Sequence, residues 1–292
     1  MKKFILLALL SSVGFAKVNV ATTFQYLGEV MKSIAGDAVK VDVLANPKLD
    51  PHFIVPKPSL IGKLRREDLL IINGGQLEIG WLPPLLKSAN NDKIQAGAEG
   101  FLDVSRVVSM IDKPKSVSRA YGDIHPDGNP HFATDIRTII PIAKLIARKL
   151  ENIDAEHKEM YAKNLDIFVK KITTLQEALN KQTQSCKGQK VVQYHELFNY
   201  ALNAYGIESI GNLEPLPGIS PSSKHTFKII NLMKKEHIDT ILQDVYHEKK
   251  TATFIAEKTG ATVKIVPHDV GATKEADSLE NFYKSIATQL CP

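Results

Sequence analysis

The sequence carries little excess charge and, beyond its first residues, no apolar run long enough to span a membrane. Its formal net charge is +5 over 292 residues, and acidic residues are mixed with the basic ones along the chain. So small an excess gives no support for a nucleic-acid partner. The apolar run at residues 4–10 has about half the length that a bilayer-spanning helix needs. We therefore expect a soluble protein of two domains of ordinary size.

Catalytic sequence motifs are also lacking. The sequence contains neither a Gly-x-Ser-x-Gly nucleophile motif nor a phosphate-binding Gly-Lys-Ser/Thr loop. The pair His195-Glu196 begins like the zinc-protease pattern, but Asn199 stands where that pattern needs its second histidine. We expect no enzyme. A zinc hydrolase that uses Glu196 or Asp269 as general base, and a surface adhesin, are the alternative functions.

Cysteine is scarce. Only Cys186 and Cys291 are present, and no Cys-x-x-Cys pair exists. In an oxidising compartment an even pair favours a disulfide over two free thiols or metal ligation. The sequence therefore predicts a bond between Cys186 and Cys291.

The N-terminus has the pattern of a secretory signal peptide. Lys2 and Lys3 precede the apolar run, and Gly14 and Ala16 are the small residues before a cleavage point. No cysteine follows the run, so lipid attachment has no obvious acceptor. We expect cleavage after Ala16 and a mature protein in the periplasm.

Two stretches of alternating strands and helices flank one long helical region. Strands are expected at residues 18–23, 39–44 and in the continuously apolar run 68–75 in the first stretch, and at 190–194, 240–243 and 261–266 in the second. The long helical region breaks near Asp154, which is expected to cap the helix after it. The pattern predicts an α/β fold of two similar lobes with parallel-type sheets flanked by helices. Their bounds are residues 17–150 and 186–292, with a linking helix at 151–185.

Four of the nine histidines lie where ligands bind in such a fold. Open α/β sheets bind ligands beyond the carboxyl ends of their strands, and four histidines are expected in loops of that kind, two from each lobe. These are His52, His131, His195 and His268. Four imidazoles would suit zinc, which takes four ligands in a tetrahedron. His125 could bind the ion or guard the entrance of the site, but it is expected to support the ligands from behind or to lie in the loop. The remaining histidines are expected at the surface: His157, His225, His237 and His247.

Several strings resemble the zinc- and manganese-binding receptors of bacterial ABC importers, an adhesin-like family. The resemblance runs over nearly the whole mature chain and depends on the order and spacing of its strings. They are Asp50-Pro51-His52 with Pro58-Ser59, residues 68–74, Gly128-Asn129-Pro130-His131 with Asp135, Tyr194-His195 with Tyr200 and Gly206, and residues 214–221.

The resemblance implies two α/β lobes bridged by one long rigid helix, with the metal in the cleft between them. It implies ligands at His52, His131 and His195, and a histidine at the third position is associated with zinc rather than manganese. Relatives usually carry an aspartate as fourth ligand. Aligning Val270-Gly271 with the relatives puts His268 there, whereas a shift of one residue would use Asp269. A third possibility is that neither binds and water occupies an open site. The implied partner is an ABC-type membrane permease, and we expect a monomer.

Overall fold

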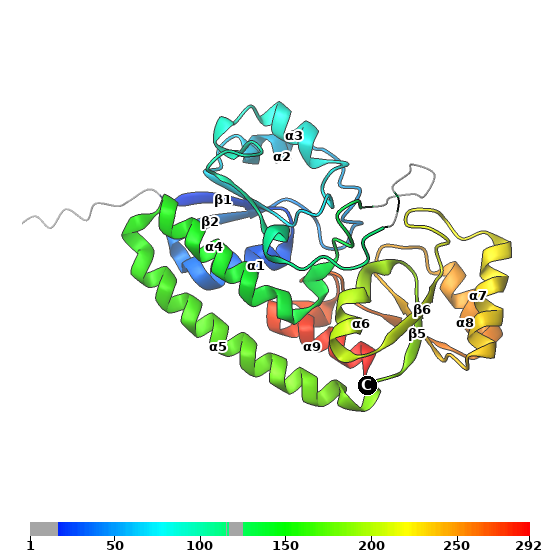
Figure 1. Cartoon of the computed structure of the whole chain (residues 1–292). Coiled ribbons are helices and arrows are strands. Elements are labelled where there is room, and N and C mark those ends of the chain that lie inside the picture. The colour runs from blue at the N-terminus through cyan, green and yellow to red at the C-terminus, as the bar shows by residue number, and fades with distance from the viewer. Residues whose placement is uncertain (1–16, 115, 117–124) are drawn as a thin grey trace, which may run out of the picture.

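The first lobe is built on a parallel sheet of four strands (Figure 1). The computed structural model describes residues 17–114, 116 and 125–292, so the predicted signal peptide lies outside the described residues. The strands are β1 (Val18–Thr22), β2 (Val39–Val43), β3 (Leu69–Ile72) and β4 (Phe101–Asp103), in the order β2-β1-β3-β4. Strand β3 is buried along its whole length, as its continuous apolar run predicts.

The second lobe repeats this topology. Its strands are β5 (Lys190–Gln193), β6 (Glu208–Asn212), β7 (Thr240–Gln243) and β8 (Thr262–Ile265), in the order β6-β5-β7-β8. Every pairing in both sheets is parallel. The carboxyl ends of the strands in each sheet therefore meet at one edge, and the loops that follow them carry polar side chains.

Helices flank both sheets (Figure 1). The first lobe has α1 (Gln25–Ala35), α2 (Pro58–Leu64) and α3 (Leu82–Ala89), and the second has α6 (Asn199–Tyr205), α7 (Ser223–Lys235) and α8 (Lys250–Thr259). Val192 and Ile241 of the second sheet pack against residues of α7 and α8 such as Ile229 and Ile255. Among the described residues, no helix combines the length and apolarity that crossing a membrane requires.

Three further helices pack together in one apolar core. Helix α4 (Ile139–Ile153) is followed by α5 (Lys158–Thr183), whose 26 residues correspond to about 39 Å. Figure 1 shows α5 along one side of the molecule, from the first lobe to the second. The last helix, α9 (Leu279–Leu290), contributes to the same apolar core as α1, α4 and α5. The prediction of two parallel-sheet lobes bridged by a long helix is confirmed.

The break between α4 and α5 differs from the prediction in its chemistry. Asp154 does not cap the following turn with its side chain. Its carboxylate instead accepts hydrogen bonds from the ring of His157 and the hydroxyl of Tyr161. The acid therefore holds side chains of the next helix rather than its backbone, and the predicted cap at Asp154 is wrong.

The predicted disulfide is formed. Cys186 lies just beyond α5 and Cys291 just beyond α9, and their Cα atoms are 5.8 Å apart. The bond joins positions 105 residues apart in sequence. It fastens the end of the linking helix to the end of the last helix, where both meet the second lobe.

Candidate metal centre

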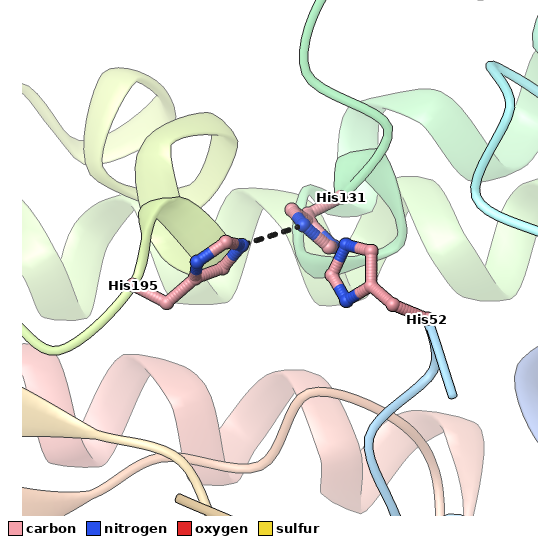
Figure 2. A group of neighbouring side chains, drawn as sticks. All are labelled: His52, His131 and His195. Carbon is pink, nitrogen blue, oxygen red and sulfur yellow. Dashed lines mark hydrogen bonds between the residues drawn. The ribbon is translucent and has the colours of Figure 1, made fainter. Parts of the chain in front are cut away.

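Three of the predicted histidines come together between the lobes (Figure 2). His52 lies in the loop after β2, His131 precedes α4, and His195 lies two residues beyond the end of β5. Each offers one ring nitrogen to a group whose donor atoms lie within 4.8 Å of one another, and all three side chains are buried. Their ring centroids are 5.0 to 5.4 Å apart. Nε2 of His131 lies 3.2 Å from Nε2 of His195. We call these three residues the histidine cluster.

His52 is oriented by an acid in its own loop. Oδ1 of Asp50 accepts hydrogen bonds from the backbone N–H of His52, at 2.9 Å, and from its ring Nδ1, at 2.8 Å. The proton on Nδ1 leaves Nε2 as the atom with a free lone pair. This Nε2 is buried and has no hydrogen-bond partner among the described residues. Asp50 therefore leaves Nε2 of His52 available to bind an ion.

The backbone before His131 is held by a polar loop. Oδ1 of Asn129 accepts a hydrogen bond from the N–H of His131 at 2.9 Å, while its Nδ2 donates to the carbonyl of Glu196 at 2.8 Å. Gly128 has φ +117°, and a Cβ there would lie 2.6 Å from the carbonyl oxygen of Ile111. A side chain at position 128 would displace this loop, so glycine is required for the turn that delivers His131.

His195 is oriented by a chain of side chains from other loops. Oε2 of Glu214 lies 2.8 Å from Nδ1 of His195, and its other oxygen lies 3.2 Å from Nε2 of His247. Nδ1 of His247 is in turn 2.6 Å from Oδ2 of Asp244, which follows β7. We call Glu214, His247 and Asp244 the supporting chain. Like Asp50 on His52, it occupies Nδ1 of His195 and leaves Nε2 for the cluster.

The charges of the supporting chain stabilise one another. Burial raises the pKa of Glu214, but hydrogen bonds from His195 and His247 outweigh burial and bring it to about 2. Burial lowers the pKa of His247, but hydrogen bonds to Asp244 and Glu214 raise it to about 9. An anionic Glu214 is thus paired with a cationic His247 near neutral pH.

The supporting chain was not identified from the sequence. His247 is expected at the surface because charged residues surround it, whereas its side chain is only 17% exposed and bonded to two acids. That prediction is wrong. Asp244 has no local signal, while Glu214 belongs to the string at residues 214–221 that carries the family resemblance.

Burial keeps His131 neutral. Its pKa is well below the usual value because of burial, and then because of the charges that His52 and His195 would carry. A neutral imidazole binds a transition metal without first losing a proton. The cluster therefore suits a cation of the zinc type, with three nitrogen donors in place and a fourth position to fill.

The two residues predicted for the fourth position have other contacts. Both oxygens of Asp269 accept backbone hydrogen bonds at the start of α1, from Gln25 and Tyr26, at 2.9 Å each. His268 is buried, and its ring packs edge-on against Tyr246 with the centroids 5.0 Å apart. Among the described residues, the group with donor atoms within 4.8 Å of one another includes neither residue. The fourth ligand stays a prediction.

His125 lies beside the cluster. Its ring stacks on that of His52, with centroids 5.4 Å apart and planes inclined by 26°, and meets the ring of His131 edge-on at 6.4 Å. A cavity of about 210 Å³ opens onto these rings, and its lining includes His125, His131, His195 and Glu196. Glu196 accepts a hydrogen bond from Asn212 at 3.0 Å. The cavity connects the histidine cluster with its surroundings.

Comparisons with known proteins agree on one family. A family profile described as "ZnuA: Zinc-uptake complex component A periplasmic" matches residues 20–291. The chain is similar to the zinc-binding lipoprotein AdcA of Streptococcus pneumoniae, 22% identical over 275 residues that cover 92% of this chain. It is also similar to the manganese ABC transporter substrate-binding lipoprotein PsaA of Streptococcus pneumoniae, 28% identical over 282 residues. This match covers 94% of this chain and 87% of PsaA.

The fold is shared with solved structures. A crystal structure of ZnuA superimposes with a TM-score of 0.79 at 21% identity, covering 94% of this chain and 98% of that one. At this identity the likeness shows the fold alone. The chain spans 54% of the length of AdcA and 63% of that of ScbA, a metal ABC transporter substrate-binding lipoprotein of Streptococcus cristatus.

Proposed function

Because this chain belongs to the family of periplasmic zinc-uptake components A, we propose that it is an exported receptor that binds Zn²⁺ and delivers it to an ABC-type permease. Relatives described as substrate-binding lipoproteins of metal ABC transporters support the receptor role and the export. They give no support for a hydrolase or an adhesin. Cleavage after Ala16, a monomeric state and lobe boundaries at residues 150 and 186 are part of the same proposal.

The histidine cluster carries the proposal. His52, His131 and His195 are buried, and their donor atoms lie within 4.8 Å of one another. We assign all three as ligands of the transported ion. Two of them have Nδ1 tied to a carboxylate, an arrangement that fixes the orientation of a metal-binding imidazole and increases its basicity.

The choice of Zn²⁺ follows from the donor atoms. The three assigned ligands are imidazole nitrogens, which suit zinc, whereas manganese favours carboxylate and water oxygens. Manganese is the second candidate, because the similar protein PsaA is described as a manganese receptor. The divalent affinity order also places Zn²⁺ above Mn²⁺ for a given set of nitrogen and oxygen ligands.

Competition between the two metals tests the proposal. The metal-free mature chain is offered equimolar Zn²⁺ and Mn²⁺, and the bound metal is identified by native mass spectrometry and elemental analysis. We expect one Zn²⁺ per chain, and loss of that ion in His52→Ala, His131→Ala and His195→Ala. The exposed His237 provides the control, since His237→Asn keeps a residue that tolerates the positive φ of 54° at this position. Preferential loading of Mn²⁺, or equal binding by all variants, would contradict the assignment.

A further inference from the structure

Two aromatic rings meet on the outer face of helices α7 and α8. The helices pack against each other at the edge of the second lobe (Figure 1), and their inner sides, with Ile229 and Ile255, are buried in its core. On the outside, Phe227 of α7 is 56% exposed and Phe254 of α8 is 36% exposed. Their ring centroids are 6.4 Å apart. Single exposed apolar side chains are common on protein surfaces, whereas a pair in contact indicates a surface that binds a partner.

Lysines lie beside both rings. Lys224 lies three residues before Phe227, and Lys250 and Lys258 lie four residues on either side of Phe254. These spacings make side chains neighbours on the surface of a helix. Nζ of Lys258 lies 5.5 Å from the centroid of the Phe254 ring. Such a lysine lays its aliphatic stem along the apolar surface and extends its ammonium group toward water or an anion.

The charge of this face is strongly positive. The two helices contain six lysines, all exposed, and one acid, Glu257. The lysines are Lys224, Lys228, Lys234, Lys235, Lys250 and Lys258. Among the described residues, Lys235 is the only one of the six in an ion pair, with Glu236 at 3.9 Å. We call these lysines, together with Phe227 and Phe254, the lysine-aromatic patch.

The composition of the patch favours a lipid surface over a protein partner. Lysine is depleted in protein–protein interfaces, which bury about 800 Å² on each partner around an apolar centre. Two rings among flexible lysines are too small for such a centre. An anionic membrane surface instead attracts clusters of about four to eight basic residues, and aromatic rings enter the boundary between headgroups and acyl chains. We propose that the lysine-aromatic patch binds the surface of a membrane that carries anionic lipid headgroups.

The patch is separate from the metal centre. None of its residues belongs to the histidine cluster or to the supporting chain. The proposed contact with a membrane therefore does not depend on the proposed metal, and each can be removed without the other.

Binding of the mature chain to lipid vesicles tests the proposal. Vesicles of phosphatidylcholine are compared with vesicles that also contain phosphatidylglycerol, by flotation at low and at high salt. The patch variant combines Lys224→Glu, Phe227→Ser and Lys228→Glu, which change exposed side chains only. The double variant Lys224→Glu and Lys228→Glu replaces it if loss of the ring disturbs folding.

A matched control is available on α5. It combines Lys163→Glu, Ile167→Ser and Lys170→Glu, which change the net charge equally and also remove one exposed apolar side chain. The zinc content of every variant is measured in parallel.

We expect the wild type to bind phosphatidylglycerol vesicles at least about tenfold more tightly than phosphatidylcholine vesicles, and to be released at high salt. The patch variant should bind at least about 25-fold more weakly, because each lysine near an anionic surface contributes a factor of about five. The α5 control should stay within about threefold of the wild type, since charges beyond the Debye length are screened. Both variants should keep the zinc content of the wild type.

Three results would overturn the inference. They are equal or no binding of the wild type to the two kinds of vesicle, equal losses in the patch variant and the α5 control, and a wild-type dimer that binds no vesicles and that the patch variant cannot form. The last result would mean that the patch joins two copies of the chain. A wild type that binds vesicles but no Zn²⁺ would instead contradict the proposed function alone.

Discussion

The two lobes share one strand order but place their histidines after different strands. His52 follows β2, the second strand of the first lobe, whereas the matching loop after β6 in the second lobe holds Glu214. His195 follows β5, the first strand of its lobe, and Phe24 occupies the matching place after β1. The lobes are therefore alike in backbone and unlike in chemistry, and the cleft is not a symmetric arrangement of equivalent loops.

The two lobes also differ in how they orient a histidine of the cluster. Asp50 holds His52 through a single oxygen and from two residues away. Glu214 uses one oxygen for His195 and the other for His247, and it depends on the ends of three different strands. The contact of Asp50 with His52 lies within one loop and is insensitive to changes elsewhere in the first lobe. The supporting chain instead makes the orientation of His195 depend on the packing of the second sheet.

Removing the disulfide is the largest expected change, and it acts on the second lobe. The paired substitution Cys186→Ser and Cys291→Ser opens a link between positions 105 residues apart. We expect the free energy of unfolding in urea to fall by about 2–5 kcal/mol. Zinc affinity at low denaturant should stay within twofold of wild type, because neither cysteine belongs to the cluster or its supporting chain. A parallel loss of affinity would show that His195 needs this link to stay in place.

In the first lobe, Glu67→Gln tests a buried acid far from the cluster. Glu67 is 2% exposed, and burial first, then the charge of Asp42, raises its pKa to about 7 from 4.5. Between these values the folded protein binds more protons than the unfolded chain, so the wild type loses stability as pH rises from 4.5 to 7. The neutral variant does not lose stability in this range. At pH 8 its free energy of unfolding should therefore exceed that of the wild type by about 3 kcal/mol. Urea unfolding of both proteins at pH 4.5 and pH 8 measures this difference. If the variant and the wild type differ equally at both pH values, the prediction is contradicted.

Glu214→Gln breaks the orientation of His195. An amide has only one oxygen, so it cannot accept from both His195 and His247, and its NH₂ group must face one of their ring N–H groups. We expect zinc affinity to fall about 10–100-fold. Glu196→Gln is the matched control, since this acid lines the cavity but contacts Asn212 rather than a cluster histidine. Equal losses in the two variants would mean that cavity charge, not orientation, sets the affinity.

Asp50→Asn should have the smallest effect. The single oxygen that serves both bonds to His52 is retained in asparagine, so Nε2 stays directed at the cluster. We expect a loss at or below about tenfold, the lower end for a supporting group. Zinc titrations of Asp50→Asn and Glu214→Gln side by side measure the difference. A larger loss for Asp50→Asn would reverse the comparison between the lobes.

Much of the fold could be predicted because its elements are marked locally. Three local patterns predict the lobes and α5. They are the continuous apolar run of β3, the alternation in β2 and the long helical region without glycine. The elements not predicted have weak local patterns: β4 has three residues, β6 contains a glycine, and α3 has two prolines in its first turn. Their positions depend on the neighbouring strand or helix rather than on their own residues.

The site was predictable only where a histidine closely follows a strand or belongs to a characteristic string. His52, His131 and His195 have such positions, and the structure brings them together. His247 does not. Asp244 precedes it by three residues in the same loop, but Glu214 approaches it only when β6 and β7 align with β5 in the sheet. For the same reason, the sequence does not choose among His125, His268 and Asp269 for a fourth ligand. The contacts that distinguish these residues cannot be derived from their spacing in the sequence.

Helix α9 has a consequence for the order in which the protein can fold. Phe282, Tyr283 and Ile286 are buried in the core shared with α1, α4 and α5, and the Tyr283 hydroxyl donates to the carbonyl of Ala133, two residues beyond His131. The first lobe thus lacks part of its core, and the His131 loop lacks an anchor, until residues near the end of the chain have been synthesised. A partly made chain cannot finish either the first lobe or the metal site, so both are completed only after the last helix docks.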